Sequence, residues 1–163
     1  MDTASRSPYA EQPPLAAYIE QQVETRLRKL AYELRHTRQS MNQERVHDLR
    51  VALRRLMETL RAAKSVLPKE GVAEVLGSLR KIMNDAGRVR SCDIAAELLG
   101  GAGVPTDAGI LTELAARRAL AERRLYDRAQ HTYRHDSTAK WRTALLHRAG
   151  LHRAGPHPPG GAV

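Results

Sequence analysis

The 163 residues suffice for about one domain, and a composition of 42% hydrophobic and 28% charged residues excludes a wholly disordered chain. Lys and Arg outnumber Asp and Glu by 27 to 18, and the net charge of +9 favours a negatively charged partner: nucleic acid, anionic lipid or an inorganic polyanion. The single cysteine, Cys92, excludes an internal disulfide, and no apolar run approaches the ~20 residues that span a bilayer.

The aromatic content of 4%, with no Phe, predicts an all-α fold, because a core of Leu, Ala, Val, Ile and Met suits close-packed helices. Residues 1–12 are polar and lack a helical period, so we expect a flexible leader there, without the pattern of a secretory signal. Pro13 and Pro14 open a first helix, expected over 14–38, because proline suits a first turn. Its apolar residues recur at spacings of three and four: Leu15, Ile19, Val23, Leu27, Leu30 and Leu34.

A second helix carries the clearest helical period in the chain, and Pro68 is expected to stop it. Its apolar seam consists of Val46, Leu49, Leu53, Leu56, Leu60, Ala63 and Leu67. A third helix is expected from near Glu70, with a weak point near Gly87. It ends at the loop 100–105, where the sequence GGAGVP combines backbone freedom with a helix breaker.

A fourth helix is expected from about Asp107, with a break at 135–137; the course of the chain beyond about residue 130 stays open. Its predicted seam consists of Ile110, Leu111, Leu114, Ala115, Ala119 and Leu125. Residues 149–163 are rich in Gly, Pro and His and predict a disordered tail. The whole is an up-and-down antiparallel four-helix bundle with long helices over 13–148.

Basic residues form a stripe on the second helix. At 100° per residue, His47, Arg50, Arg54 and Arg61 fall within about 60° of one another, beside the apolar seam rather than opposite it. Residues beside a seam lie where two helices meet, so a neighbouring helix can add cations to the same groove. Arg guanidinium groups bind phosphate oxygens in a bidentate fork, which makes the stripe a candidate phosphate site. The alternative is a solvated charged face.

The stretch VHDLRVALRRL, residues 46–56, resembles the signature of the CHAD domain, the conserved histidine α-helical domain: a His, an Arg-Val three residues later, then a basic pair. A second element of that family, Gly followed by Arg-Asp-x-Asp-Val, is similar to residues 87–94. The resemblance implies a helical domain that binds inorganic polyphosphate through basic residues lining a groove. The ligands that it implies are His47, Arg50, Arg54, Arg55 and Arg90; the stripe adds Arg61, and charge and proximity along the third helix add Arg80, Lys81 and Arg88.

The chain departs from the family pattern at two positions and in length. Met57 stands where the family often has a further Arg, and Ser91 replaces the first Asp of the second element, leaving Asp93 to orient Arg90. The resemblance covers residues 14–148, which corresponds to one of the two four-helix halves of a full CHAD domain. Either the chain is a truncated copy, or two chains form a homodimer that completes the groove, which is the reading we favour.

The leading interpretation is therefore a non-enzymatic, cytoplasmic protein that binds polyphosphate, with granule association as an open extension and no membrane partner. A nucleic-acid-binding helical protein is the first alternative, although base-stacking aromatics and a helix-turn-helix are not evident. The second alternative is an enzyme, a phosphohydrolase, or an accessory to one; an acidic cluster that could hold catalytic metal ions is not evident in the sequence. No cofactor or metal site is predicted; His131 and His135, four residues apart, are the weak candidates for a metal. Arginines between 117 and 128 are read mainly as partners of nearby acidic residues.

Overall fold

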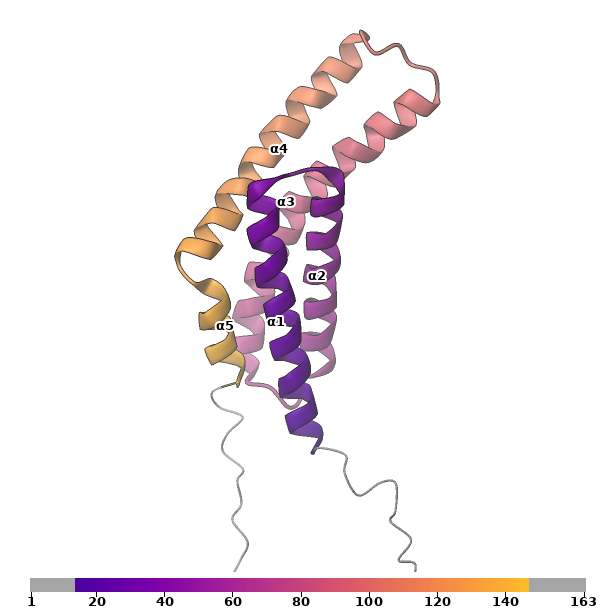
Figure 1. Ribbon diagram of the computed structural model, residues 1–163. Coiled ribbons are helices and arrows are strands. Elements are labelled where there is room, and N and C mark those ends of the chain that lie inside the picture. Colours follow the sequence, from indigo (N-terminus) through magenta and orange to yellow (C-terminus); the bar gives the residue numbers. More distant parts are fainter. Residues whose placement is uncertain (1–13, 147–163) are drawn as a thin grey trace, which may run out of the picture.

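The computed structural model describes residues 14–146, and its helices follow one another up and down (Figure 1). They are α1 (Leu15–Gln39), α2 (Gln43–Ala62), α3 (Lys69–Gly101), α4 (Gly109–Arg134) and α5 (Ser137–Leu146). The all-α class is confirmed, and residues 14–146 contain no strand. The predicted leader and tail lie outside the described residues. Of the described helices, none is long and apolar enough to cross a membrane.

Helices α1 and α2 form an antiparallel hairpin whose seams pack as predicted except at the start of α1, where Leu15 is 69% exposed. Val23, Leu27, Leu30 and Leu34 of α1 are buried, against a row on α2 that runs from Val46 to Leu60. The side chain of Asn42 accepts a hydrogen bond from the backbone N–H of Arg45 and so caps the start of α2. Because the hairpin buries the seam, the basic stripe beside it lies at the edge of the core.

Helix α2 ends at Ala62, earlier than the predicted stop at Pro68. A hydrogen-bonded turn follows, in which the N–H groups of Val66 and Leu67 donate to the carbonyl oxygen of Ala63 at 2.9 and 3.0 Å. Ala63 and Leu67 are nevertheless buried, because the turn folds their side chains back over the end of the core. Pro68 begins the next element instead: it is the N-cap of α3, a place where its fixed φ and missing N–H cost nothing.

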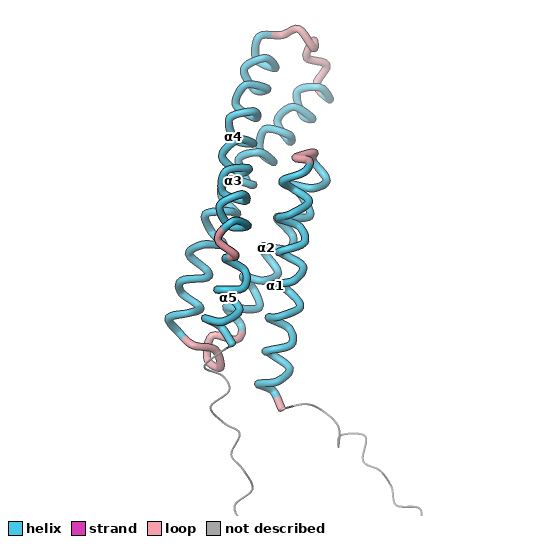
Figure 2. The backbone as a smooth tube through the Cα atoms, turned by 60° about the vertical axis from the view of Figure 1, so that its left-hand side comes forward, coloured by secondary structure: helices cyan, strands magenta, loops and turns pink. Residues whose placement is uncertain are grey.

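Helix α3 runs through the expected weak point at Gly87 without interruption. Together with α4 it forms an arm that extends past the loop joining α1 to α2 (Figures 1 and 2). The expected loop after α3 is confirmed, and Gly103 there has a φ of 78°, in the left-handed region that glycine adopts without strain.

The predicted seam of α4 is wrong in its first half. Of its six residues only Leu125 is buried, while Ile110 is 55% exposed. The buried residues of α4 are Ala121, Leu125, Ala129 and Thr132, which lie in its second half. In the arm the first turns of α4 have only α3 beside them (Figure 1), so no third helix covers a seam there.

The break at 135–137 is confirmed. Asp136 has a φ of 46°, a conformation that Asp tolerates better than most residues, and the chain turns there into α5. Trp141 and Leu145 of α5 are buried against the bundle. Arg142 of α5 also pairs with Glu24 of α1, 3.1 Å away. A hydrogen bond from Arg28, opposed by desolvation and aided by the charge of Arg142, lowers the pKa of Glu24 from its ordinary value of 4.5.

Candidate functional site

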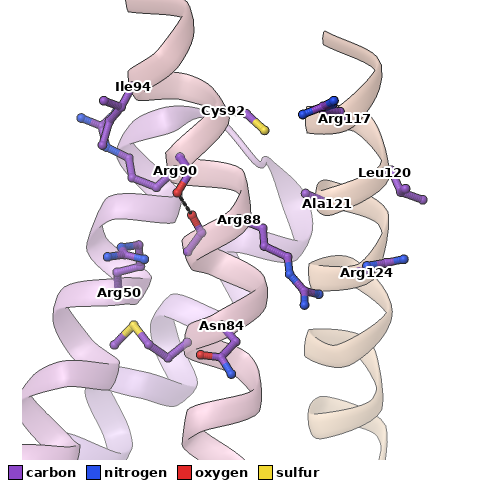
Figure 3. Close-up of a pocket in the computed structure, with 13 residues that line it drawn as sticks. Arg50, Asn84, Arg88, Arg90, Cys92, Ile94, Arg117, Leu120, Ala121 and Arg124 are labelled. Carbon is purple, nitrogen blue, oxygen red and sulfur yellow. Dashed lines mark hydrogen bonds between the residues drawn. The ribbon is translucent and has the colours of Figure 1, made fainter. Parts of the chain in front are cut away.

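An open hollow of about 700 Å³ lies where α2, α3 and α4 come together (Figure 3). Five arginines from the three helices line it: Arg50, Arg88, Arg90, Arg117 and Arg124. The rest of the lining is small, apolar or neutral, and it includes Asn84, Gly87, Ser91 and Cys92. The described lining residues thus contain five cations and no carboxylate, which makes the hollow a strongly positive surface.

Arg50 reaches this hollow because the facing residue on α3 is a glycine. A Cβ placed on Gly87 would lie only 3.0 Å from Nη1 of Arg50. The guanidinium group therefore lies against the backbone of α3, in space that any larger side chain would contest. Gly87, predicted as a weak point of the helix, instead makes room for a cation.

Arg88 and Arg90 leave α3 on different sides. In Figure 3 Arg88 extends toward α4, whereas Arg90 lies on the side of α2. Arg88 is 3.4 Å from a carboxylate oxygen of Asp85, and Arg90 is 3.3 Å from one of Glu97. Both pairs are longer than an ordinary charge-assisted hydrogen bond and are partly exposed, so they neutralise the two arginines only weakly.

The expectation that Asp93 orients Arg90 is wrong. Asp93 is buried and accepts a hydrogen bond from Nε of Arg118 on α4 at 2.6 Å. Arg118 also bonds Glu122, and it donates to the carbonyl oxygen of Met41 in the loop between α1 and α2 at 3.1 Å. Desolvation lowers the pKa of Arg118, but its hydrogen bonds to the two carboxylates outweigh that effect and raise the pKa above its ordinary value. Asp93 thus ties α3 to α4, and the acidic partner of Arg90 is Glu97 instead.

A second buried carboxylate joins α3 to α4 near the other end of the hollow. Asp85, 4% exposed, is bonded by Arg128 of α4 as well as by Arg88. Arg118 and Arg128 are therefore paired with buried carboxylates of the protein itself. The local pairing expected on α4 is present for Arg117 with Glu113 and for Arg118 with Glu122.

Sequence reasoning missed two arginines of α4. Arg117 and Arg124 line the hollow. Their separation of seven residues, two helical turns, places both on one face, and this was the available signal. That spacing did not favour Arg117 and Arg124 over the other arginines of α4 as site residues, because acidic residues stand near all of them in the sequence. Arg124 forms no ion pair with any residue of the described range.

The remaining predicted ligands lie outside the hollow, and all are exposed: His47, Arg54, Arg55, Arg61, Arg80 and Lys81. None of them forms an ion pair within residues 14–146. Because α2 and α3 run antiparallel, the direction from Arg50 to Arg54 along α2 is the same in space as the direction from Gly87 to Arg80 along α3. By helical spacing, Arg54 and Arg61 share the face of α2 that carries Arg50, and Arg80 shares the face of α3 that carries Gly87. Arg55 and Lys81 point about 100° away from those faces.

Two further positions clarify the chemistry. Met57, where the family pattern often has Arg, is 6% exposed and belongs to the core. The rings of His131 and His135 stack with centroids 4.1 Å apart, and no three metal-ligating side chains gather within the described part of the chain.

A search of curated proteins and a search of solved structures found no significant match. The family model described as the CHAD domain matches residues 21–162, most of the chain, including the histidine-arginine stretch on α2 and the glycine-arginine stretch on α3. The chain therefore belongs to the CHAD domain family.

Proposed function

We propose that this protein binds inorganic polyphosphate, without hydrolysing it, along the edge where α2, α3 and α4 meet. The observation that carries the proposal is the hollow lined by five arginines and no carboxylate. Its positive surface continues along α2 through Arg54 and Arg61. A linear polyanion can use such an extended row, whereas a single phosphate ion engages only one part of it.

The arginines of the hollow are unpaired or only weakly paired within the described residues, which supports binding of an external anion. Arg50 and Arg124 form no ion pair within residues 14–146. Arg117 pairs with Glu113, but the side chains are 70% and 62% exposed, so the pair contributes little. A chain of phosphates can replace such carboxylates without leaving a buried charge. Guanidinium forks also match phosphate oxygens in geometry, which favours phosphate over other anions.

The mechanism is electrostatic neutralisation with counterion release. Each phosphate bound by a cation frees a condensed counterion, so affinity should fall steeply as salt rises, as for other linear polyanions. Reducing the number of arginines should lower the slope of log Kd against log salt together with the affinity itself. This pair of changes distinguishes a direct phosphate contact from a loss of folding.

The test compares two variants of equal net charge. Arg50→Glu with Arg54→Glu places two acids in the proposed site, while Arg123→Glu with Lys140→Glu places them on exposed positions elsewhere. Binding of long-chain polyphosphate and of orthophosphate is measured by calorimetry, and helicity by circular dichroism. We expect the first variant to lose polyphosphate binding with its helicity intact, and the second to keep most of it. Equal binding by wild type and the first variant would refute the proposal.

Two alternatives are separated by direct assays. Binding of nucleic acid predicts that duplex DNA competes with polyphosphate at matched phosphate concentration, whereas we expect polyphosphate to win. A role in phosphate hydrolysis predicts release of orthophosphate from tripolyphosphate with a divalent metal, and we expect none.

We also propose that two copies pair through the arm. Its exposed apolar side chains include Ile94, Leu98, Ile110 and Leu120, which are 42%, 68%, 55% and 55% exposed. Ile94 and Leu120 also line the hollow, so a second copy seated on the arm would add a wall and its own arginines to the site. Sedimentation should show a dimer that Leu98→Lys dissociates. A monomer at high concentration, with and without polyphosphate, would overturn the pairing.

A further inference from the structure

A second hollow, of about 590 Å³, lies between α1 and the corner where α4 turns into α5. Ala31 and Leu34 contribute apolar surface to it, and Leu34 is buried. Tyr32 and Tyr133 contribute aromatic rings, and Asp136 of the α4–α5 turn contributes a carboxylate. The hollow does not share a lining residue with the five-arginine hollow, so the two are separate places on the protein.

Arginine side chains give this second hollow its positive charge. Arg28, Arg35 and Arg134 all line it. Arg28 is held by Glu24 at 2.8 Å, but Arg35 and Arg134 form no ion pair within residues 14–146. Both are exposed on opposite walls, Arg35 from α1 and Arg134 from the last turn of α4. Two uncommitted guanidinium groups facing one space are suited to an anionic group such as phosphate.

The aromatic rings distinguish this hollow from the first, which has none. The guanidinium carbon of Arg38 lies 4.1 Å from the ring centroid of Tyr133, and the rings of Tyr32 and His36 lie 3.9 Å apart. Tyr133 is thus held on one side by a cation while 58% of the residue remains exposed. A ring fixed in this way offers a flat surface to a planar ligand, because stacking requires little further ordering.

We propose that this hollow binds a mononucleotide. The base stacks on Tyr133, the phosphates contact Arg35 and Arg134, and the carboxylate of Asp136 accepts a hydrogen bond from a ribose hydroxyl or a base amino group. The volume is within the range of small-ligand sites, and the combination of an apolar floor with a few convergent polar groups is typical of them. The proposal does not depend on polyphosphate binding, since its residues belong to the other hollow.

The test compares ADP with pyrophosphate, which carries the same phosphate linkage without a base. Dissociation constants are measured by calorimetry on the full chain. We expect ADP to bind at least about fivefold more tightly than pyrophosphate, because stacking of a base on one aromatic ring contributes at least that factor. Tyr133→Leu should remove this preference, and Arg134→Gln should weaken both ligands. Tyr126→Leu and Arg123→Gln, exposed positions of α4 outside the hollow, are the matched controls and should change neither.

Several outcomes would overturn the nucleotide site. Equal affinity for ADP and pyrophosphate would show that no base is recognised. A preference for ADP that survives in Tyr133→Leu, or that disappears in the variant with Arg50→Glu and Arg54→Glu, would place the base elsewhere. Circular dichroism and thermal unfolding of each variant separate these outcomes from misfolding. If the wild-type chain fails to bind polyphosphate but keeps the ADP preference, only the earlier proposal is refuted.

Discussion

Gly87 offers a perturbation whose effects on stability and on binding should have opposite signs. Glycine inside an exposed helix is about 1 kcal/mol less favourable than alanine, so Gly87→Ala should stabilise α3. The added Cβ would lie 3.0 Å from Nη1 of Arg50, a distance at which the flexible guanidinium must yield by a few tenths of an ångström. Gly87→Leu adds three more carbons and should displace the guanidinium altogether.

The size of the binding loss follows from the contact that is removed. A hydrogen bond to a charged group contributes about 1.5–3 kcal/mol, so loss of the Arg50–phosphate contact should weaken polyphosphate binding roughly 10- to 150-fold in Gly87→Leu. The alanine variant should lose much less. Loss of one phosphate contact should also reduce the magnitude of the slope of log affinity against log salt, by about 0.7–0.9 if polyphosphate behaves as nucleic acids do.

The assay measures polyphosphate binding over a series of salt concentrations and stability by urea denaturation. Gly77 provides the matched control, because it lies in the same helix and a Cβ placed there meets nothing within 4 Å. Gly77→Ala and Gly77→Leu should leave binding unchanged. If Gly87→Leu binds polyphosphate as tightly as Gly77→Leu does, the inference that Gly87 makes room for a phosphate-binding arginine is wrong.

Three further predictions concern stability. Gly71→Ala should lower it by about 1–3 kcal/mol in urea denaturation, because the Cβ would lie 2.4 Å from a backbone oxygen of α5. Arg118→Leu should cost roughly 3 kcal/mol because Asp93 stays buried without its cation, whereas Arg117→Leu should cost under about 0.5 kcal/mol. Acidification through the lowered pKa of Glu24, below 4.5, should protonate it and release its two arginines. The stabilisation that this carboxylate provides is present above pH 4.5, and hydrogen exchange at the α1–α5 contact should detect its loss.

Helical periodicity predicted the elements that are covered on two sides and failed where coverage is partial. The α1 and α2 seams are rows of large Leu and Val residues, so the 3.6-residue period identified their buried faces. On α4 the choice lay between rows of alanine, and Ala115 and Ala119 are exposed while Ala121 and Ala129 are buried. Alanine is small enough to suit either environment. The end of α2 was misplaced because apolar spacing continued through the turn that follows it.

The candidate site was predictable on α2 and only partly elsewhere. The helical wheel placed Arg50 beside the seam, and the structure brings it to the hollow. The partners of Arg118 could not be read from local spacing, because Asp93 is 25 residues away and competes with a carboxylate one turn along the same helix. Without that long-range pairing, arginines committed to internal ion pairs cannot be separated from arginines that face solvent.

The two buried carboxylates of α3, Asp85 and Asp93, also fix the position of α4 along the axis of α3. An alanine-rich surface could slide along its neighbour by one turn with little change in packing. Such a slip would carry Arg118 and Arg128 away from Asp93 and Asp85, leaving desolvated negative charges that cost several kcal/mol. The two ion pairs therefore destabilise any arrangement in which α4 is shifted along α3. Insertions within α4 between these arginines should consequently be tolerated far less than insertions in the loop at 102–108.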